Sequence, residues 1–222
     1  MLKIIKKLIT IYILLLLTAC APTYTVNTLN EQALTELSSE QIVNLNLQSC
    51  LYHDSNQIAV KQSHPLNQYL YRLIQPFPNT INGKELNYRV YLNTQPNAWS
   101  SLNGCIRINS GLLKILNDHE IQAVIAHEIG HIALNHSITA FHHAKAAEIK
   151  NNNEIILFVP QSLSQKQEIA ADNYAINLLK QLNIDPNVLI TMLDKLNNYQ
   201  KEQSYSHPTI MIRKNNLINK IN

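Results

Sequence analysis

The chain has 222 residues, of which 45% are hydrophobic and 15% are charged, and its formal net charge is +3. This length accommodates one domain with a substantial core, so we do not expect two domains. Three of the 18 basic residues precede position 8, whereas all 15 acidic residues come later, so the chain after its leader is neutral. Because no basic cluster remains to contact phosphates, the sequence excludes nucleic-acid binding.

Residues 1–19 have the layout of a secretory signal peptide, with a basic start and an apolar run from Leu8 to Leu17. A membrane anchor is the less favoured alternative, because a spanning helix needs about 20 apolar residues. The ending LTAC, which closes at Cys20, resembles the lipobox of bacterial lipoproteins. That resemblance implies cleavage before Cys20 and lipidation of its sulfur, with ordinary cleavage nearby as the alternative.

Residues 20–30 contain Thr, Asn and Pro with little periodicity and are interpreted as a tether, which leaves residues 31–222 as the folded domain. If Cys20 is lipidated, Cys50 and Cys105 remain as an even pair in an oxidising compartment, which predicts a disulfide. Two buried free thiols are the alternative, because a bridge requires Cα atoms within about 7 Å of each other.

Helical spacing of apolar residues predicts one or two helices between Leu34 and Leu47. Another helix is expected to begin at Pro65 and to stop before Pro76, because proline suits the first helical position and cannot continue a helix. These segments account for the first part of the domain.

The hydrophobic period then changes to two. Residues 86–93 alternate apolar and polar side chains, which is typical of a half-buried strand, and residues 104–111 are expected to be its partner. The connection 94–103 is rich in turn residues and carries the only tryptophan, Trp99, which we interpret as a packing residue.

A long helical stretch is predicted from Asn117, which can cap it together with Glu120 at the third helical position, to the asparagines at 151–153. The apolar run 154–160 that follows is compatible with a strand, the edge of a helix or a flap, and periodicity does not decide among them.

Two more helices are predicted toward the end of the chain. One begins at a capping box formed by Ser164 and Gln167. The other has Asp185 as its cap and Pro186 as its first helical residue.

The stretch AVIAHEIGHIALNH, residues 123–136, places histidines and a glutamate in an apolar helix. His127 and His131 are four residues apart, so their side chains differ by only about 40° around the helix and face one point. This HExxH spacing is typical of a zinc site in which Glu128, beside the ion, acts as general base on a water molecule. The alternative is a surface pair of histidines with a chance glutamate.

His136 lies nine residues after His127, which on a continuous helix places it about 180° away, so we do not expect it to be a ligand. A catalytic zinc site commonly completes two histidines with a carboxylate. Glu168 and Asp172, four apart on the next predicted helix, can supply one ligand and one hydrogen-bond acceptor for a ligand histidine. Two solvated carboxylates are the alternative.

HEIGH followed by EIAAD, with NAW and NGCIRINSGLL before them and SHPTIMIR after them, resembles the HtpX-like zinc metallopeptidases of the gluzincin class. Within that family the similarity is to periplasmic lipoprotein members. It covers residues 86–213. The resemblance implies an α+β, mostly helical zincin-type domain with a small antiparallel sheet beside the active-site helix.

The resemblance also implies a role for each site residue. The implied Zn²⁺ ligands are His127, His131 and Glu168. Glu128 corresponds to the general base, and Asp172 to the acid that contacts a ligand. His207 begins a His-Pro-x4-Arg pattern that ends at Arg213, and it corresponds to a histidine that stabilises the oxyanion or occupies the open zinc position at rest.

Three functions are compatible with these features. The first is a lipid-anchored endopeptidase at the periplasmic face of the outer membrane, which acts on unfolded or misassembled envelope proteins and has the outer-membrane assembly machinery as a candidate partner. Its substrate would lie as an added strand along the edge near residues 86–93. The second is a non-catalytic chaperone or assembly lipoprotein, and the third is a structural zinc protein, which would favour four closed protein ligands. An intact Glu128 favours the enzyme.

Overall fold

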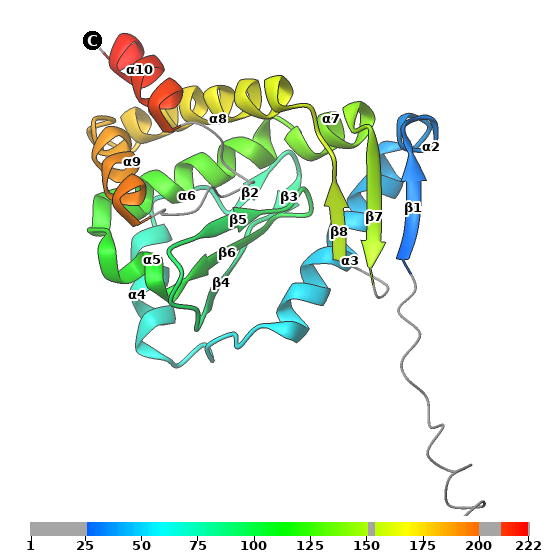
Figure 1. Ribbon diagram of the computed structural model, residues 1–222. Helices are drawn as coiled ribbons and strands as arrows, with labels where there is room; N and C mark the ends of the chain where they lie inside the picture. The colour runs from blue at the N-terminus through cyan, green and yellow to red at the C-terminus, as the bar shows by residue number, and fades with distance from the viewer. Residues whose placement is uncertain (1–25, 151–153, 200–209, 222) are drawn as a thin grey trace, which may run out of the picture.

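The computed structural model describes residues 26–150, 154–199 and 210–221 (Figure 1). Its elements in chain order are β1 Val26–Asn30, α2 Glu31–Thr35, α3 Ser39–Asn56, α4 Pro65–Ile74, β2 Thr80–Ile81, β3 Lys84–Glu85, β4 Asn87–Tyr91, β5 Ala98–Ser100, β6 Cys105–Asn109, α5 Ser110–Ile115, α6 Asp118–Ala133, α7 His136–His143, β7 Ala146–Lys150, β8 Glu154–Leu157, α8 Gln161–Gln181, α9 Val188–Tyr199 and α10 Ile210–Ile221. The predicted α+β, mostly helical architecture is confirmed.

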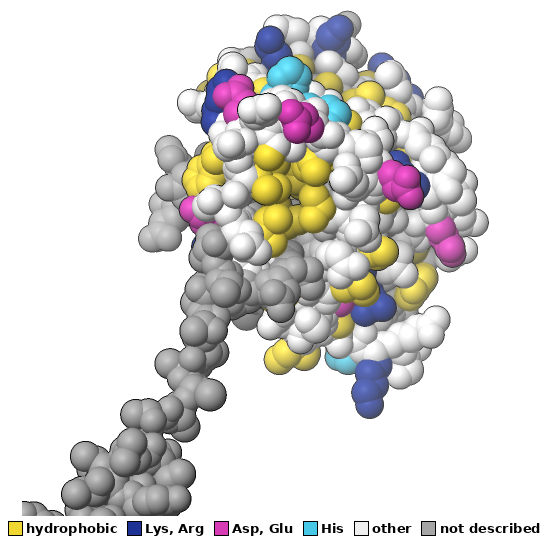
Figure 2. Space-filling model, turned by 90° about the vertical axis from the view of Figure 1, so that its right-hand side faces the viewer, with side chains coloured by type: hydrophobic (Ala, Val, Ile, Leu, Met, Phe, Trp, Pro, Cys, Tyr) yellow, Lys and Arg dark blue, Asp and Glu magenta, His cyan; other side chains and the backbone are white. Residues whose placement is uncertain are grey.

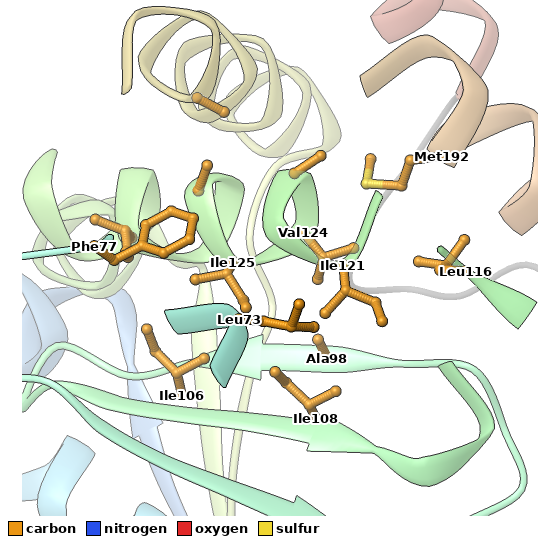
Figure 3. Packing of buried hydrophobic residues seen from close by; sticks show 14 of the residues in the cluster. Leu73, Phe77, Ala98, Ile106, Ile108, Leu116, Ile121, Val124, Ile125 and Met192 are labelled. Atoms are coloured by element: carbon orange, nitrogen blue, oxygen red, sulfur yellow. The ribbon is translucent and has the colours of Figure 1, made fainter. Parts of the chain in front are cut away.

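The main core lies between α6 and the sheet β4-β6-β5 (Figure 1). Ile121 and Ile125 of α6 are fully buried and point toward Ile106 and Ile108 of β6 (Figure 3). On its other side α6 packs along α8, the longest helix among the described residues. A helix covered on both faces must be apolar nearly all round, which explains why the histidine motif sits in an apolar run.

The sheet beside α6 is mixed. β5 pairs with β6 in antiparallel register, whereas β4 pairs with β6 in parallel register. The predicted partnership of residues 86–93 and 104–111 is therefore correct, but the connection between them contains a third strand. Because β5 occupies the far side of β6, the chain reverses twice between β4 and β6 and returns in the same direction.

A second sheet, β1-β7-β8, is wholly antiparallel and lies at the other end of the molecule with α2, α3 and α7 (Figure 1). It covers a smaller core that includes Leu34, Ile42 and Phe141. Figure 2 shows hydrophobic side chains gathered on the face of the molecule at this end. Among the described residues, none of the helices has the length and hydropathy of a membrane span.

The disulfide between Cys50 and Cys105 is confirmed, with 6.6 Å between the Cα atoms. It ties α3 to the start of β6. The Nη2 atom of Arg107 lies 3.2 Å from the sulfur of Cys50, and this guanidinium also donates to both carboxylate oxygens of Asp54 on α3. α3 is thus joined to the central strand by a covalent and an ionic link.

Several predicted boundaries hold and several do not. α4 begins at Pro65 and ends before Pro76, and α6 is capped by Asn117 and Glu120, as predicted. The helix from Asn117, however, ends at Ala133 rather than at 151–153. The cause is Asn135, whose positive φ of 52° ends the α-helix and redirects the chain into α7.

The remaining differences are at element ends. α8 begins at Gln161 rather than after a capping box at Ser164, because the carbonyl of Pro160 already accepts bonds from the amides of Leu163 and Ser164. α9 begins at Val188, since residues 185–187 form a turn in which the Asp185 side chain accepts a hydrogen bond from the backbone N–H of Asn187.

Two segments that the sequence left undecided or irregular are strands. The apolar run at 154–160 contains β8, and residues 26–30 at the end of the expected tether form β1. Both strands pair with β7, which is itself in the region predicted to be helical. The expected leader and Cys20 lie outside the described residues.

Candidate metal centre

The first two site residues come from consecutive turns of α6. His127 and His131 project from the side of α6 that faces α8, and their Nε2 atoms are 3.0 Å apart. His127 is 3% exposed, and His131 is half-buried. The predicted geometry of the HExxH spacing, in which two imidazoles face one point, is therefore present.

Glu168 of α8 completes a group of three donors. Its two carboxylate oxygens are each 3.3 Å from an Nε2 atom, one from His127 and one from His131. The donor atoms of the three residues all lie within 4.8 Å of one another, and Glu168 is 2% exposed. The long-range step in the prediction, from α6 to a carboxylate on α8, is thus matched by the packing of the two helices.

The close approach of α6 and α8 depends on Gly130. A Cβ atom at this position would lie 3.0 Å from the carbonyl oxygen of Ala171 and 3.2 Å from its Cα. Both contacts are to backbone, which cannot turn aside as a side chain can. The glycine inside HEIGH therefore lets Glu168 reach the two histidines.

Two further side chains surround the ligands. Asp172, fully buried one turn after Glu168, lies 2.8 Å from Nδ1 of His127. Arg213 of α10 is 4% exposed and holds both oxygens of Asp172 at 2.7 and 2.8 Å, with Nη1 3.1 Å from Glu168. The C-terminal helix is therefore attached to the site by a buried cation between two carboxylates.

The electrostatics of this cluster follow from its burial and its charges. Burial raises the pKa of Asp172, but the charges and hydrogen bonds of Arg213 and His127 outweigh it and lower the pKa to about 2. Burial and Arg213 lower the pKa of His127, but the carboxylates of Asp172 and Glu168 raise it to about 9. A metal ion at this ring therefore competes with a proton, which is usual for histidine ligands.

His136 is placed differently from the prediction. Instead of facing away, its Nδ1 atom lies 2.9 Å from Nδ1 of His131, and its side chain is buried. The prediction of 180° assumed a continuous helix, but the chain leaves α6 at Ala133 and turns at Asn135. The signal that could have been used was Asn135 itself, because asparagine is the residue other than glycine that most readily adopts positive φ.

Glu128 lies between two cavities. One is lined mainly by apolar side chains of α6 and α9, including Val124, Met192 and Leu193, and also by Arg213. The other is more polar and is lined by residues of β5, α7 and α8 together with His131 and His136. Glu128 is 3% exposed and is common to both cavities.

The strand beside these cavities is β5, not the one expected. Residues 96–98 line the apolar cavity and residues 99–102 line the polar one, so β5 runs from one to the other past Glu128. β4, Asn87–Tyr91, is the opposite edge of the same sheet, and none of its residues lines either cavity. A substrate strand added near residues 86–93, as expected from the sequence, would therefore lie at the edge away from both cavities. The sequence predicts a turn-rich connection where β5 lies. Trp99 of β5 contacts the ring of His53, with 5.1 Å between centroids.

The donor set fits zinc. Two imidazole nitrogens and one carboxylate are the ligands of many catalytic zinc sites, which keep a fourth position open. Among the residues that the structure describes, His127, His131 and Glu168 are the ones whose donor atoms lie close enough together to hold a metal ion. His207 lies outside the described residues, so its place relative to this group is not part of the structure.

Comparison with known proteins gives a consistent result. Residues 61–220 match the model of peptidase family M48. The chain is similar to metalloprotease LoiP of Escherichia coli K12, with 33% identity over 72% of this chain and 71% of that protein. It is also similar to metalloprotease YcaL of the same organism, with 32% identity over 82% and 81%. A protease HtpX homolog of Campylobacter hominis is 24% identical over 76% and 73%.

Proposed function

The chain belongs to peptidase family M48 and is a metallopeptidase, and from that premise we propose that it is a zinc endopeptidase which cleaves unfolded or misassembled envelope proteins. The single observation that carries the proposal is the position of Glu128. It is buried one residue after a metal-binding histidine and lies at the junction of two cavities that together can receive a chain on both sides of a peptide bond.

Zinc held by His127, His131 and Glu168 would supply Lewis acidity, lowering the pKa of water and polarising a peptide carbonyl. Glu128 then accepts the proton of the attacking water and delivers it to the leaving amine. Asp172 accepts the Nδ1 proton of His127, which directs the Nε2 lone pair toward the metal position. Arg213 fixes the side chains of Glu168 and Asp172 and thereby ties α10 to α8 at the site.

An unfolded chain fits this site as an added strand along β5. β5 is an edge strand, so it has backbone groups on one side for pairing with a substrate. An antiparallel substrate would run from the polar cavity to the apolar one, because β5 runs in the opposite sense. Recognition through the backbone is independent of sequence, which suits an enzyme for many unfolded substrates.

We place the enzyme at the periplasmic face of the outer membrane, anchored by lipid on Cys20. The support is the sequence: a basic and apolar leader that ends in LTAC, and a following alanine that resembles an outer-membrane sorting signal. One acyl chain gives only marginal membrane binding and several give stable anchoring. Mass spectrometry of the N-terminal peptide from membranes tests this, and an unmodified Cys20 in the mature chain refutes it.

The test of the enzyme is Glu128→Gln, which keeps the size of the side chain and removes the proton acceptor. The substrate is a reduced and alkylated protein, and Glu85→Gln, at an exposed glutamate of β3, is the control. We expect zinc content and melting temperature to be unchanged in both variants, and cleavage to fall about 10²–10⁴-fold only in Glu128→Gln. Equal cleavage by Glu128→Gln and wild type, with zinc in both, would refute the role of Glu128 as general base. Absence of cleavage by zinc-replete wild type would leave the non-catalytic chaperone as the better explanation.

A further inference from the structure

His136 contacts a metal-binding histidine at an atom that points away from the metal position. The Nε2 atom of His131 is in the group of donors, 3.3 Å from Glu168, while its Nδ1 atom lies 2.9 Å from Nδ1 of His136. The two rings are nearly perpendicular, with an interplanar angle of 77°. Contact at Nδ1 leaves Nε2 of His131 available to a metal.

We propose that His136 is the positioning residue for His131, as Asp172 is for His127. The proposal rests on the proposed zinc site but concerns a residue outside it. Each of the two histidines ligates through Nε2, and each then carries its ring proton on Nδ1. The proton of His127 is accepted by a carboxylate, and that of His131 is accepted by an imidazole nitrogen.

This arrangement fixes the tautomer of His136. Because His131 donates from Nδ1, the Nδ1 atom of His136 must be an unprotonated acceptor, and the proton of the neutral His136 ring is on Nε2. Two neutral rings bonded in this way orient His131 without adding a second negative charge beside it. The two zinc histidines therefore have unequal partners, one anionic and one neutral.

The backbone holds His136 in place independently of any metal. His136 is the first residue of α7, which begins after the left-handed turn at Asn135. Its carbonyl oxygen accepts a hydrogen bond of 2.8 Å from Nε2 of Gln167, on α8 next to Glu168. α7 and α8 are thus joined at the point where the imidazole reaches His131, so the acceptor is preorganised for the ligand.

The test compares variants that keep or remove the acceptor atom. In His136→Asn, a side-chain oxygen takes the place of Nδ1, whereas His136→Leu fills similar space without an acceptor. His143→Leu, at an exposed histidine of the same helix, is the control. Zinc affinity is measured by competition with a chromogenic chelator, together with the visible spectrum of the cobalt-substituted protein.

We expect His136→Leu to lose about 10–100-fold in zinc affinity, the usual effect of removing such a partner, and to change the cobalt spectrum. His136→Asn should recover most of the affinity, and His143→Leu should equal wild type. The melting temperature of the chelator-treated protein separates positioning from folding. If His136→Leu lowers it while zinc affinity and spectrum stay as in wild type, the proposal is overturned.

The same measurements distinguish failure of this proposal from failure of the zinc site. Wild-type protein that binds no stoichiometric zinc would overturn the proposed function, whatever His136 does. Wild-type affinity in His136→Leu, with zinc present in both proteins, would overturn only the positioning role.

Discussion

Replacing Arg213 by methionine is expected to destabilise the protein strongly. The guanidinium is 4% exposed and contacts both oxygens of Asp172 and one of Glu168, at 2.7, 2.8 and 3.1 Å. Methionine is long and apolar enough to fill much of the space, but it leaves two buried carboxylates without their cation. The change therefore tests the ionic link rather than the packing of α10.

The expected size of the effect follows from burial. Removing one partner of a buried ion pair costs about 3–5 kcal/mol, because the other charge stays buried and uncompensated. For a domain of this size each kcal/mol lowers the melting temperature by about 2–4 °C, so the expected drop is roughly 6–20 °C. A bound zinc ion offsets part of the charge on Glu168, so the drop should be larger after chelation.

The assay is thermal unfolding with and without a chelator, and Lys214→Met is the matched control. Lys214 is the next residue and pairs with Asp194 at the surface, where such pairs contribute about 0.2–1 kcal/mol. A difference of 2 °C in melting temperature corresponds to about one kcal/mol at most. If Arg213→Met melts within 2 °C of Lys214→Met in the absence of metal, the ionic link does not stabilise the fold and the reasoning is wrong.

Three further predictions concern the fold around the site. Reducing the Cys50–Cys105 bridge, which spans 55 residues, should lower the free energy of unfolding by about 4 kcal/mol in the chain-entropy model. This loss is measured as a lower midpoint of urea unfolding, and an unchanged midpoint contradicts the prediction. Gly130→Val should cost about 1–3 kcal/mol by overpacking and also weaken zinc binding, and a variant that binds zinc as wild type does would refute the role of the close helix contact. The pKa of Asp172 is lowered to about 2 in the folded protein, so its ionised carboxylate contributes fully to the free energy of unfolding above the unfolded pKa of about 4, and this contribution is lost as pH falls toward 2. Asp172→Asn should therefore make the free energy of unfolding less dependent on pH in this range. An equal slope of stability against pH in both proteins would argue against this role of Asp172.

The parts of the fold that the sequence predicted depend on local signals. Pro65 and Pro76 bound α4, and Asn117 with Glu120 caps α6, because these residues act on the backbone within one turn. The convergence of His127 and His131 is likewise a property of one helix. Such features follow from periodicity and capping without knowledge of the rest of the molecule.

The parts that it missed depend on pairing over long distances or on one residue. β1, β7 and β8 form a sheet whose outer strands are more than 100 residues apart in the chain, and none of the three has strong alternation of its own. β5 has only three residues and is a strand because β6 lies beside it. The position of His136 was mistaken because a single left-handed residue, Asn135, interrupts the helix.

Glu168 was predicted correctly as a neighbour of the two histidines, but local signals alone did not identify it. Its spacing from Asp172 was visible in the sequence, but so were other carboxylates, and resemblance to a family selected this pair. In the structure Glu168 lies at the site because α8 crosses α6 closely at Gly130, which brings its carboxylate within 3.3 Å of both histidines. Helix contact, rather than spacing along one helix, places the third donor.

The most direct test of the proposed zinc centre is an anomalous difference map at the zinc absorption edge, from crystals of protein purified without chelator. We predict one strong peak about 2.0–2.2 Å from Nε2 of His127, Nε2 of His131 and a carboxylate oxygen of Glu168. A zinc peak at any other place in the protein, or zinc-replete crystals without a peak between these three residues, would contradict the account.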